Sequence, residues 1–364
     1  MEITAAVLRR PDAPYSLETL QLADPGPGQA RVRIEAVGHC HTDLLPRAGV
    51  LPIPMPVVAG HEGAGVVEAV GPGVTSIVPG DHVVISYASC GACPACSQGR
   101  PFGCDLFAPL NLIGATLDGS VTATDAEGTS IATRWFGQSS FASHALATER
   151  NVVRIDPDLP FDLMAPLGCG LLTGAGTVLN TLQPSPGDSI AVFGTGAVGS
   201  AAIMAAAAAG CTTIVGIDLH DHRLELAREL GATHTVRGDV DDVAAAVTAS
   251  TGRGVRLALD TTGVNSVVSA AVTSLEVGGT AALVGVAAPD LAIPANLLSM
   301  GKTVVGVIEG DADPAAFIPR LISLWRAGRF PIEKLVTTYP LSEIDRAEQA
   351  AAVGEVVKPV LLPG

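Results

Sequence analysis

The stretch Asp188-Ser-Ile-Ala-Val-Phe-Gly-Thr-Gly-Ala-Val-Gly199 determines the expected fold class, because an apolar run leads directly into a glycine-rich turn. The apolar residues predict a buried strand over 188–193. The alanine-rich segment after the turn predicts a helix that ends at Gly210, and a second strand over 213–217 follows, ending at Asp218. Strand, glycine turn, helix and strand in this order are typical of a dinucleotide-binding unit.

Each glycine of the turn has a distinct task in such a unit. Gly194 allows the tight turn, Gly196 lets the backbone approach a pyrophosphate, and Gly199 lets the helix pack closely on the strand. The helix begins near Ala197 and Val198, where its N-terminus supplies partial positive charge for the phosphates.

The acid that ends the second strand indicates which cofactor is bound. Asp218 is expected to accept hydrogen bonds from the adenosine ribose and to repel a 2′-phosphate, which favours NAD over NADP. Arg223 is a basic candidate for contact with the same part of the cofactor; otherwise it lies on a solvated helix face beside Glu225.

The rest of the chain suggests two kinds of structure. Apolar strands predicted over 255–260, 280–286 and 303–308, with helical spans between several of them, extend the first unit into a parallel sheet. The first 150 residues are rich in Val, Ile and Gly, have frequent turn signals and lack long helical periodicity, which predicts a small β-barrel.

Size and charge narrow the function classes. A chain of 364 residues is expected to form two domains. The net charge of −15 argues against a nucleic-acid partner, because phosphate binding needs a basic face. No signal-peptide pattern opens the chain, and the most apolar run, residues 201–209, is too short to cross a bilayer. We therefore expect a cytoplasmic protein with no membrane partner.

Four of the seven cysteines lie in one short loop, Cys90-Gly-Ala-Cys-Pro-Ala-Cys-Ser-Gln-Gly-Arg-Pro-Phe-Gly-Cys104. Disulfides do not suit a reducing compartment, and four thiols do not match a single redox pair. Exposed unpaired thiols are a liability. The spacing of Cys90, Cys93, Cys96 and Cys104 therefore predicts a closed structural zinc site.

A second, open metal site is indicated by Cys40, His61 and Cys169. Two thiolates and one imidazole leave a fourth tetrahedral position for water or substrate, the pattern of a catalytic zinc. Asp43 and Glu62 are natural partners for orienting the imidazole or tuning the metal. Each residue alone is equally consistent with a buried structural His or a small core Cys.

Taken together, these motifs resemble the zinc-dependent medium-chain dehydrogenase/reductase family, the alcohol dehydrogenases. The resemblance covers essentially the whole chain and includes Gly-His-Glu at 60–62, the four-cysteine loop and Gly-Cys-Gly at 168–170. It implies an α/β fold: a Rossmann doubly wound parallel sheet plus a GroES-like β-barrel catalytic domain. The implied boundaries are 1–170 for the first part of the catalytic domain, 171–308 for the NAD-binding domain and 309–364 for the segment that completes the catalytic domain.

The resemblance also assigns metal roles. It implies a catalytic zinc on Cys40, His61 and Cys169, and a structural zinc on the four-cysteine loop, so two zinc ions per chain. Asp43 is implied to hydrogen-bond His61, and Glu62 to lie just behind the catalytic zinc.

Further residues match the family's reaction and cofactor positions. Thr42 matches the hydroxyl that takes the alcohol proton; otherwise it is an ordinary loop residue. Leu45 stands where many members carry the His that ends the proton relay, so the exit of the proton is left open. The implied cofactor contacts outside the turn are His41, Thr173, Val286 and Lys358, the last of which is equally consistent with a surface lysine.

Trp135 and Phe136 fall where the family places bulky residues of the substrate pocket; otherwise they are a core aromatic pair. Phrases such as Cys-His-Thr-Asp and Gly-His-Glu-Gly-Ala-Gly are most similar to the bacterial aryl-alcohol branch of the family. The implied reaction is reversible oxidation of primary aromatic or allylic alcohols to aldehydes with NAD. The implied assembly is a homodimer or homotetramer, and the apolar stretch 281–286 is expected to offer an edge for pairing across subunits. Aliphatic or terpenoid alcohols, and an S-(hydroxymethyl)thiol adduct of formaldehyde, are alternative substrates. A non-catalytic NAD-binding sensor is the alternative outside the enzymes.

Overall fold

The computed structural model describes residues 1–285 and 290–364, which divide into two compact units. Unit 1 comprises Met1–Cys169, Asp313–Ile322 and Ile332–Gly364, and unit 2 comprises Gly170–Ala312 and Ser323–Pro331. The predicted first boundary, between residues 170 and 171, lies one residue from this division. The return to unit 1 begins at Asp313 rather than at residue 309, and residues 323–331 belong to unit 2.

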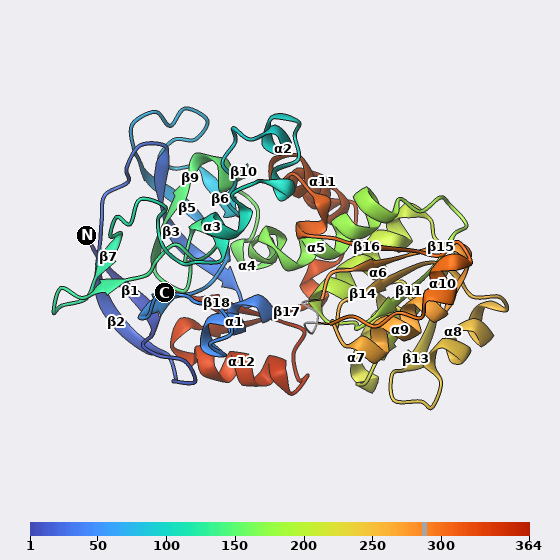
Figure 1. The fold of residues 1–364 in the computed structure, drawn as a ribbon. Coiled ribbons are helices and arrows are strands. Elements are labelled where there is room, and N and C mark those ends of the chain that lie inside the picture. Colours follow the sequence, from blue (N-terminus) through green and yellow to red (C-terminus); the bar gives the residue numbers. More distant parts are fainter. Residues whose placement is uncertain (286–289) are drawn as a thin grey trace. The chain divides into compact units, whose positions relative to one another are not determined.

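Unit 1 is built from two β-sheets, as expected for its barrel-like domain (Figure 1). In the first, the strand order is β4-β1-β2-β7-β8, with bounds Val57–Val58, Glu2–Leu8, Ser16–Leu22, Ala123–Thr124 and Ser130–Ile131. In the second, the order is β10-β6-β5-β3-β18-β17, with bounds Val152–Ile155, His82–Ile85, Glu62–Val70, Gln29–Gly38, Lys358–Leu362 and Val336–Pro340. β9 (His144–Thr148) also pairs with β3.

Two features of the second sheet matter for the site. β3 and β5 pair antiparallel, so that Gly38 at the end of β3 lies opposite Glu62 at the start of β5. The C-terminal strand β18 pairs with the same end of β3, through Val360 and Leu361. Segments near residues 40, 61 and 358 are thereby brought to one edge of the sheet.

The helices of unit 1 are short, apart from two near the C-terminus. They are α1 (Leu44–Arg47), α2 (Pro94–Ser97), α3 (Phe107–Asn111), α4 (Phe161–Met164), α12 (Ile344–Ala352) and the first part of α11 (Pro314–Arg326). Single 3-10 turns include η1 (His41–Asp43), η3 (Trp135–Gly137) and η5 (Ala165–Gly168). The apolar core, with Leu8, Leu20, Ile85, Trp135 and Phe141 among its largest members, is buried beneath these elements.

Unit 2 contains a six-stranded parallel sheet in the order β13-β12-β11-β14-β15-β16, which confirms the predicted Rossmann-type fold. The strands are β11 (Ser189–Phe193), β12 (Thr213–Asp218), β13 (His234–Arg237), β14 (Val255–Asp260), β15 (Leu275–Leu283) and β16 (Thr303–Gly306). The helices are α5 (Gly170–Gly176), α6 (Ala197–Ala209), α7 (Asp221–Glu229), α8 (Val243–Thr251), α9 (Asn265–Thr273) and α10 (Ala295–Ser299). A π-helical segment, η6 (Thr177–Leu182), follows α5.

The glycine turn has the backbone that its sequence predicts. Gly194 adopts φ 85°, and Gly210 ends α6 at φ 91°, both in the left-handed region that glycine enters without steric cost. A Cβ on Gly199 would lie 1.9 Å from the carbonyl oxygen of Gly194, so only glycine permits this packing. α6 therefore begins directly beyond the end of β11.

One expectation about the sheet edge was wrong. We expected the apolar stretch 281–286 to offer an edge for pairing across subunits. Within the described residues, β15 is not an edge strand, because it pairs with β14 on one side and with β16 on the other. β16 is the last strand of the sheet on this side, and Val286 lies outside the described residues.

Among the described residues, no single helix has the length and apolarity needed to cross a membrane. Phe161–Gly168 and Gly170–Leu182, a bent pair, meet that test of length and composition only when taken together.

Candidate metal centre and cofactor-binding turn

Three loop ends of unit 1 bring the predicted zinc ligands together. Cys40 follows β3, His61 directly precedes β5, and Cys169 follows η5. The pairing of β3 with β5 places the first two side by side, and Ser86 Oγ donates to the Gly168 carbonyl at 2.6 Å, which holds the segment before Cys169. The ligand atoms of Cys40, His61, Glu62 and Cys169 all lie within 4.8 Å of one another. We call these four residues the metal group.

The imidazole of His61 is oriented by Asp43. Its Nδ1 lies 2.7 Å from Asp43 Oδ1, and both side chains have no exposed surface. Within the described part of the chain, Nε2 of His61 has no hydrogen-bond partner although it is buried. A buried nitrogen without a partner costs free energy unless something binds it. Next to two thiols, this nitrogen completes a donor set that fits zinc.

The pKa values within the metal group favour the ionised thiol. A hydrogen bond with Cys169, together with His61 and Lys358, holds the pKa of Cys40 well below its ordinary value, although burial opposes the shift. Burial also opposes a charge on His61, but Asp43 and Cys40 raise the pKa of the imidazole well above its ordinary value. Both directions favour the ionised Cys40 thiol beside His61, and a bound cation would take the place of any proton on Nε2.

Glu62 and Lys358 form a buried ion pair behind the thiols. Lys358 Nζ lies 2.7 Å from Glu62 Oε2 and donates to the carbonyl of His39 at 3.1 Å. Burial raises the pKa of Glu62, whereas the carboxylate raises the pKa of Lys358 despite burial. Lys358 is only 1% exposed, so it is not a surface lysine, and its expected contact with a pyrophosphate stays a prediction.

The residues expected to handle protons and cofactor lie on η1. Thr42 is half-buried, with Oγ1 3.8 Å from Cys40 Sγ, and His41 is exposed. Leu45, one turn further along, packs partly buried against the apolar core of unit 1. Position 45 therefore provides no side-chain base to continue a proton relay from Thr42.

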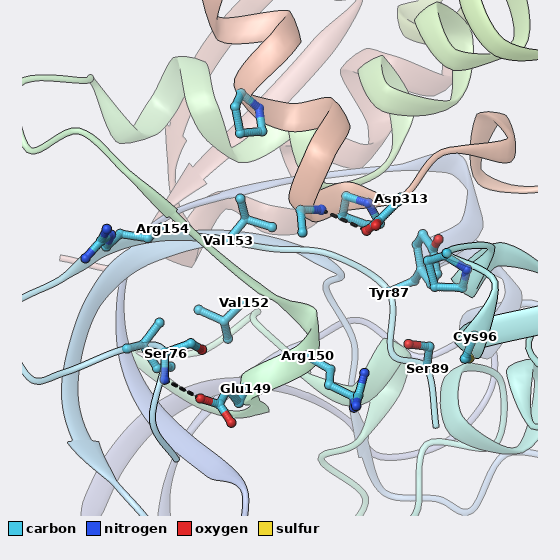
Figure 2. Close-up of a pocket in the computed structure, with 16 residues that line it drawn as sticks. Ser76, Tyr87, Ser89, Cys96, Glu149, Arg150, Val152, Val153, Arg154 and Asp313 are labelled. Atoms are coloured by element: carbon cyan, nitrogen blue, oxygen red, sulfur yellow. Dashed lines mark hydrogen bonds between the residues drawn. The ribbon is translucent and has the colours of Figure 1, made fainter. Parts of the chain in front are cut away.

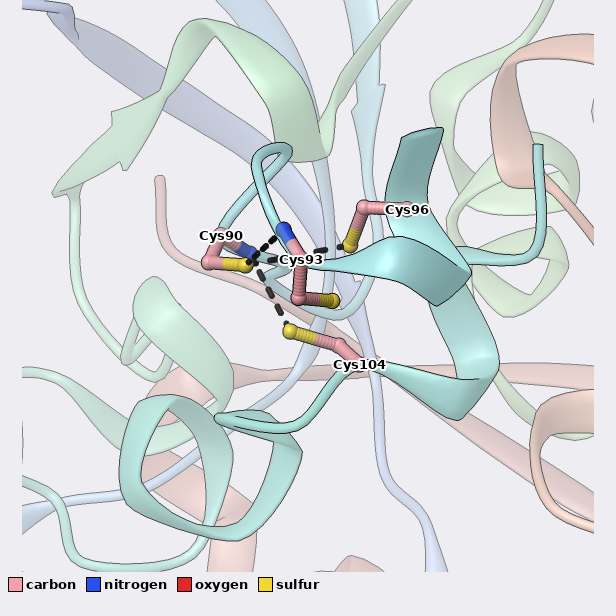
Figure 3. A group of neighbouring side chains, drawn as sticks. All are labelled: Cys90, Cys93, Cys96 and Cys104. Carbon is pink, nitrogen blue, oxygen red and sulfur yellow. Dashed lines mark hydrogen bonds between the residues drawn. The ribbon is translucent and has the colours of Figure 1, made fainter. Parts of the chain in front are cut away.

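The four-cysteine loop closes around a common centre, as Figure 3 shows for Cys90, Cys93, Cys96 and Cys104. Their sulfurs lie within 4.8 Å of one another, and Cys90 Sγ is 3.9 Å from Cys96 Sγ. Backbone N–H groups of Ala92 and Cys93 lower the pKa of Cys90 to about 6, while burial raises the pKa of Cys104 to about 12. All seven cysteines are free of disulfides. Four convergent thiols fit a tetrahedral zinc.

Trp135 and Phe136 lie against His61 and Asp43. The Trp135 side chain has no exposed surface, and its Nε1 donates to Asp43 Oδ1 at 3.0 Å. The Phe136 ring stacks on the His61 imidazole, with ring centroids 4.3 Å apart. Their role in lining a substrate pocket stays a prediction.

Sequence reasoning missed Gln138, whose buried amide joins three segments of unit 1. Its Nε2 donates to the carbonyls of His61 and Ser86, and its Oε1 accepts from the N–H of Gly63. The available signal was its place inside an apolar aromatic stretch, where a polar side chain needs partners.

In unit 2, the glycine turn leaves open space at Gly196. A Cβ on Gly196 would meet nothing within 4 Å, which leaves open space beside the N-terminus of α6. Asp218 ends β12 nearby: its Oδ2 accepts from the N–H and the hydroxyl of Thr195, and its Oδ1 accepts from the N–H of His220. The residues therefore fit a pyrophosphate and an adenosine ribose.

The other predicted cofactor residues are distributed around unit 2. Thr173 is half-buried on α5, and its carbonyl accepts from the hydroxyl of Thr177. Arg223 is half-buried on α7, and its Nε has no hydrogen-bond partner among the described residues. Val286 lies outside the described residues.

A cavity of about 520 Å³ in unit 1 is separate from the metal group (Figure 2). It lies beside the four-cysteine loop, and its described lining includes Tyr87, Cys96, Arg150 and Arg154. None of these lining residues belongs to the metal group. Volume alone therefore does not identify the site where ligand chemistry is concentrated.

Comparisons with known proteins agree with this geometry. The family model described as an alcohol dehydrogenase GroES-like domain matches residues 26–157, and that described as a zinc-binding dehydrogenase matches residues 197–324. The chain is 44% identical to the geraniol dehydrogenase of Castellaniella defragrans over 98% of its own length and 97% of the relative's.

Two solved structures are also similar over the full length of both chains. An alcohol dehydrogenase zinc-binding domain protein from Burkholderia ambifaria has a TM-score of 0.97 at 44% identity. The benzyl alcohol dehydrogenase from Acinetobacter calcoaceticus has a TM-score of 0.96 at 39% identity.

Proposed function

The chain belongs to the zinc-type alcohol dehydrogenase family, and from that premise we propose that it oxidises primary allylic and aromatic alcohols to aldehydes with NAD. One observation carries the proposal: the ligand atoms of Cys40, His61 and Cys169 converge with Glu62 to within 4.8 Å, and His61 Nε2 is left without a hydrogen-bond partner among the described residues. Two thiols and one such nitrogen form a three-ligand set that leaves one position open for substrate.

The proposed reaction converts alcohol and oxidised NAD into aldehyde, reduced NAD and one proton. When bound, zinc supplies a Lewis acid that lowers the pKa of the alcohol hydroxyl, and NAD accepts the hydride. With a cation in the group, Asp43 would keep the remaining proton of His61 on Nδ1, so that Nε2 offers its lone pair to the metal. Thr42, half-buried two residues after Cys40, is the hydroxyl that receives the alcohol proton. Because residue 45 is a leucine, the proton passes to solvent without a side-chain base there.

The substrate class is supported by what two similar proteins share. One is named for geraniol and the other for benzyl alcohol. Both compounds are primary alcohols whose carbinol carbon is bonded to an unsaturated carbon, and both give conjugated aldehydes. We therefore propose this feature, rather than the aromatic ring alone, as the property the enzyme selects.

The alternative substrate, an S-(hydroxymethyl)thiol adduct that carries negative charge, would need an accessible basic residue, and the segment 106–134 does not provide one. Arg134 is the single basic residue between positions 106 and 134. It is 8% exposed, donates to the carbonyl of Leu146 at 2.6 Å, and has its pKa lowered to about 10 by burial. A guanidinium held in this way is not available to the carboxylates of a peptide thiol.

NAD is proposed as the cofactor because an acid, Asp218, ends β12 beside the glycine turn. A 2′-phosphate brought to this carboxylate would be repelled. A cytoplasmic location and a homodimeric or homotetrameric assembly stay predictions.

The test is a matched substrate panel followed by NADH absorbance. Geraniol is paired with its fully saturated form, and benzyl alcohol with cyclohexylmethanol. We expect kcat/KM for each unsaturated alcohol to exceed that of its partner by about tenfold or more, a discrimination within the reach of an apolar pocket. Equal values within both pairs would contradict the substrate proposal, and no turnover of any alcohol would contradict the reaction.

A further inference from the structure

Asp43, which orients His61, is a carboxylate with no exposed surface and four hydrogen-bond donors. Oδ2 accepts from the N–H of Cys40 at 3.1 Å. Oδ1 accepts from the N–H of Gly60 at 3.0 Å and lies 2.7 Å from His61 Nδ1. The fourth donor is the indole Nε1 of Trp135, 3.0 Å from Oδ1. A buried carboxylate requires donors of this kind, because burying an uncompensated charge is costly.

Trp135 reaches this carboxylate from a turn that is tightly fixed. Its N–H donates to Ser139 Oγ at 2.9 Å, and its carbonyl accepts from the N–H groups of Gln138 and Ser139 at 3.0 Å. Phe136 and Ser139 both adopt left-handed φ values, 49° and 53°, which residues other than glycine rarely take. Such backbone persists only where surrounding contacts hold it.

The same turn contacts His61 at two further points. The Phe136 ring stacks on the imidazole at an interplanar angle of 26°, and Gln138 Nε2 donates to the His61 carbonyl at 2.8 Å. The ring face, the backbone and the carboxylate partner of His61 are therefore all fixed by residues 135–138. Because His61 Nδ1 is hydrogen-bonded to Asp43, only Nε2 is left to act as a metal ligand together with the two thiols.

We propose that Trp135 is a positioning residue of the metal group: its indole N–H fixes Asp43, which in turn holds His61 with Nε2 toward Cys40 and Cys169. This inference rests on the proposed function, because it takes the metal group to hold zinc. It gives Trp135 a polar task that a core aromatic or a pocket wall does not have. Phenylalanine at this position keeps most of the ring and loses the donor.

The experiment compares Trp135→Phe with Trp325→Phe, the change at the chain's only other tryptophan, which lies half-buried on α11 in unit 2. Release of zinc from each whole protein to a chromogenic chelator is followed in time. Each zinc ion is expected to give its own kinetic phase of release, and the phase that is missing in His61→Ala belongs to the zinc of the metal group. The other phase, from the four-cysteine loop, reports on the folding of unit 1.

We expect Trp135→Phe to release the zinc of the metal group about 10–100-fold faster, the usual effect of removing a group that orients a metal ligand. The four-cysteine zinc should leave at the wild-type rate, and Trp325→Phe should match the wild type in both phases. In the cobalt-substituted protein, Trp135→Phe should also shift the visible absorption bands of the metal. In an Asp43→Asn background, Trp135→Phe should add little, because the two residues act through one hydrogen bond.

Unchanged release from the metal group together with an unchanged cobalt spectrum would overturn the inference. Equal acceleration of both phases would also overturn it, since that is the signature of general destabilisation. If the wild-type protein holds zinc only in the four-cysteine loop, the proposed function fails rather than this inference alone.

Discussion

Glu62 and Lys358 are two buried charges, and each is compensated by the other. The carboxylate has no exposed surface and the ammonium 1%, and they lie 2.7 Å apart. Glu62 also belongs to the metal group, so its charge affects the site directly. Breaking a buried pair by removing one partner is far more costly than breaking an exposed one, because the remaining charge is left without compensation.

We therefore expect Lys358→Met to lower the free energy of unfolding by about 3–5 kcal/mol. The measurement is urea unfolding of the zinc-loaded protein in a Trp325→Phe background, where the tryptophan fluorescence comes from Trp135 in the same unit. Adding Glu62→Gln to Lys358→Met should recover part of the loss, because no buried charge then remains unpaired.

The matched control is Arg346→Met, also in unit 1. Arg346 is 73% exposed on its side chain and pairs with Glu343, so its loss should cost less than about 1 kcal/mol. If the lysine and arginine changes cost the same, the Glu62–Lys358 pair is not the stabilising contact described above.

In the turn between β11 and α6, alanine substitutions at two glycines are expected to have different effects: one lowers stability and the other lowers cofactor affinity. Gly199→Ala places a Cβ against the Gly194 carbonyl and should destabilise unit 2 by about 1–3 kcal/mol through overpacking. Gly196→Ala meets nothing within 4 Å and should leave stability within about 1 kcal/mol of the wild type. Its methyl group instead occupies the space expected for the pyrophosphate, so NADH affinity should fall about tenfold or more, a loss of about 1.4 kcal/mol.

Thermal unfolding and NADH fluorescence titration separate these outcomes. Gly196→Ala with wild-type NADH affinity would show that the pyrophosphate does not approach this turn. Gly199→Ala with wild-type stability would show that the close packing of α6 on the end of β11 is not required.

The four-cysteine loop is expected to bind zinc in a strongly pH-dependent way. Burial raises the pKa of Cys96 and raises that of Cys104 to about 12, so both thiols carry protons in the metal-free loop at neutral pH. Each must release its proton when zinc binds, and apparent affinity therefore rises with pH. Cys90, with a pKa of about 6, is already a thiolate at neutral pH and adds to the dependence only below that value.

The measurement is chelator competition in His61→Ala, where this loop is the expected zinc site. Affinity should fall as the pH is lowered from about 8 to about 6, because protons compete with the metal. Affinity that stays constant over this range would contradict the protonation of Cys96 and Cys104.

For the whole molecule, local patterns predicted the fold and the two groups of candidate ligands whose side chains the structure brings together. Five of the six strands were predicted because each is a short apolar run bounded by glycine, acidic or other turn residues, as β11 and β14 show. β13, with the sequence His-Thr-Val-Arg, is not an apolar run and was missed. The candidate ligands of the four-cysteine loop could be named because four of the seven cysteines lie within fifteen residues. Both signals lie within a few residues of sequence.

Contacts between distant segments could not be predicted in the same way. Trp135 and Asp43 are 92 positions apart, and Lys358 and Glu62 are 296 apart. The first contact depends on left-handed backbone at Phe136 and Ser139, and the second on β18 pairing with the end of β3. Neither feature leaves a periodic mark in the sequence, which is why the pairing of Lys358 with Glu62 was not predicted.

The account as a whole requires one catalytic and one structural zinc in each chain. Zinc content and alcohol-dependent NADH formation, measured on the same samples of wild-type protein and His61→Ala, test this most directly. We predict two zinc ions and turnover in the wild type, and one zinc with no turnover in the variant. Two zinc ions in His61→Ala, or alcohol oxidation that survives the change, would contradict the account.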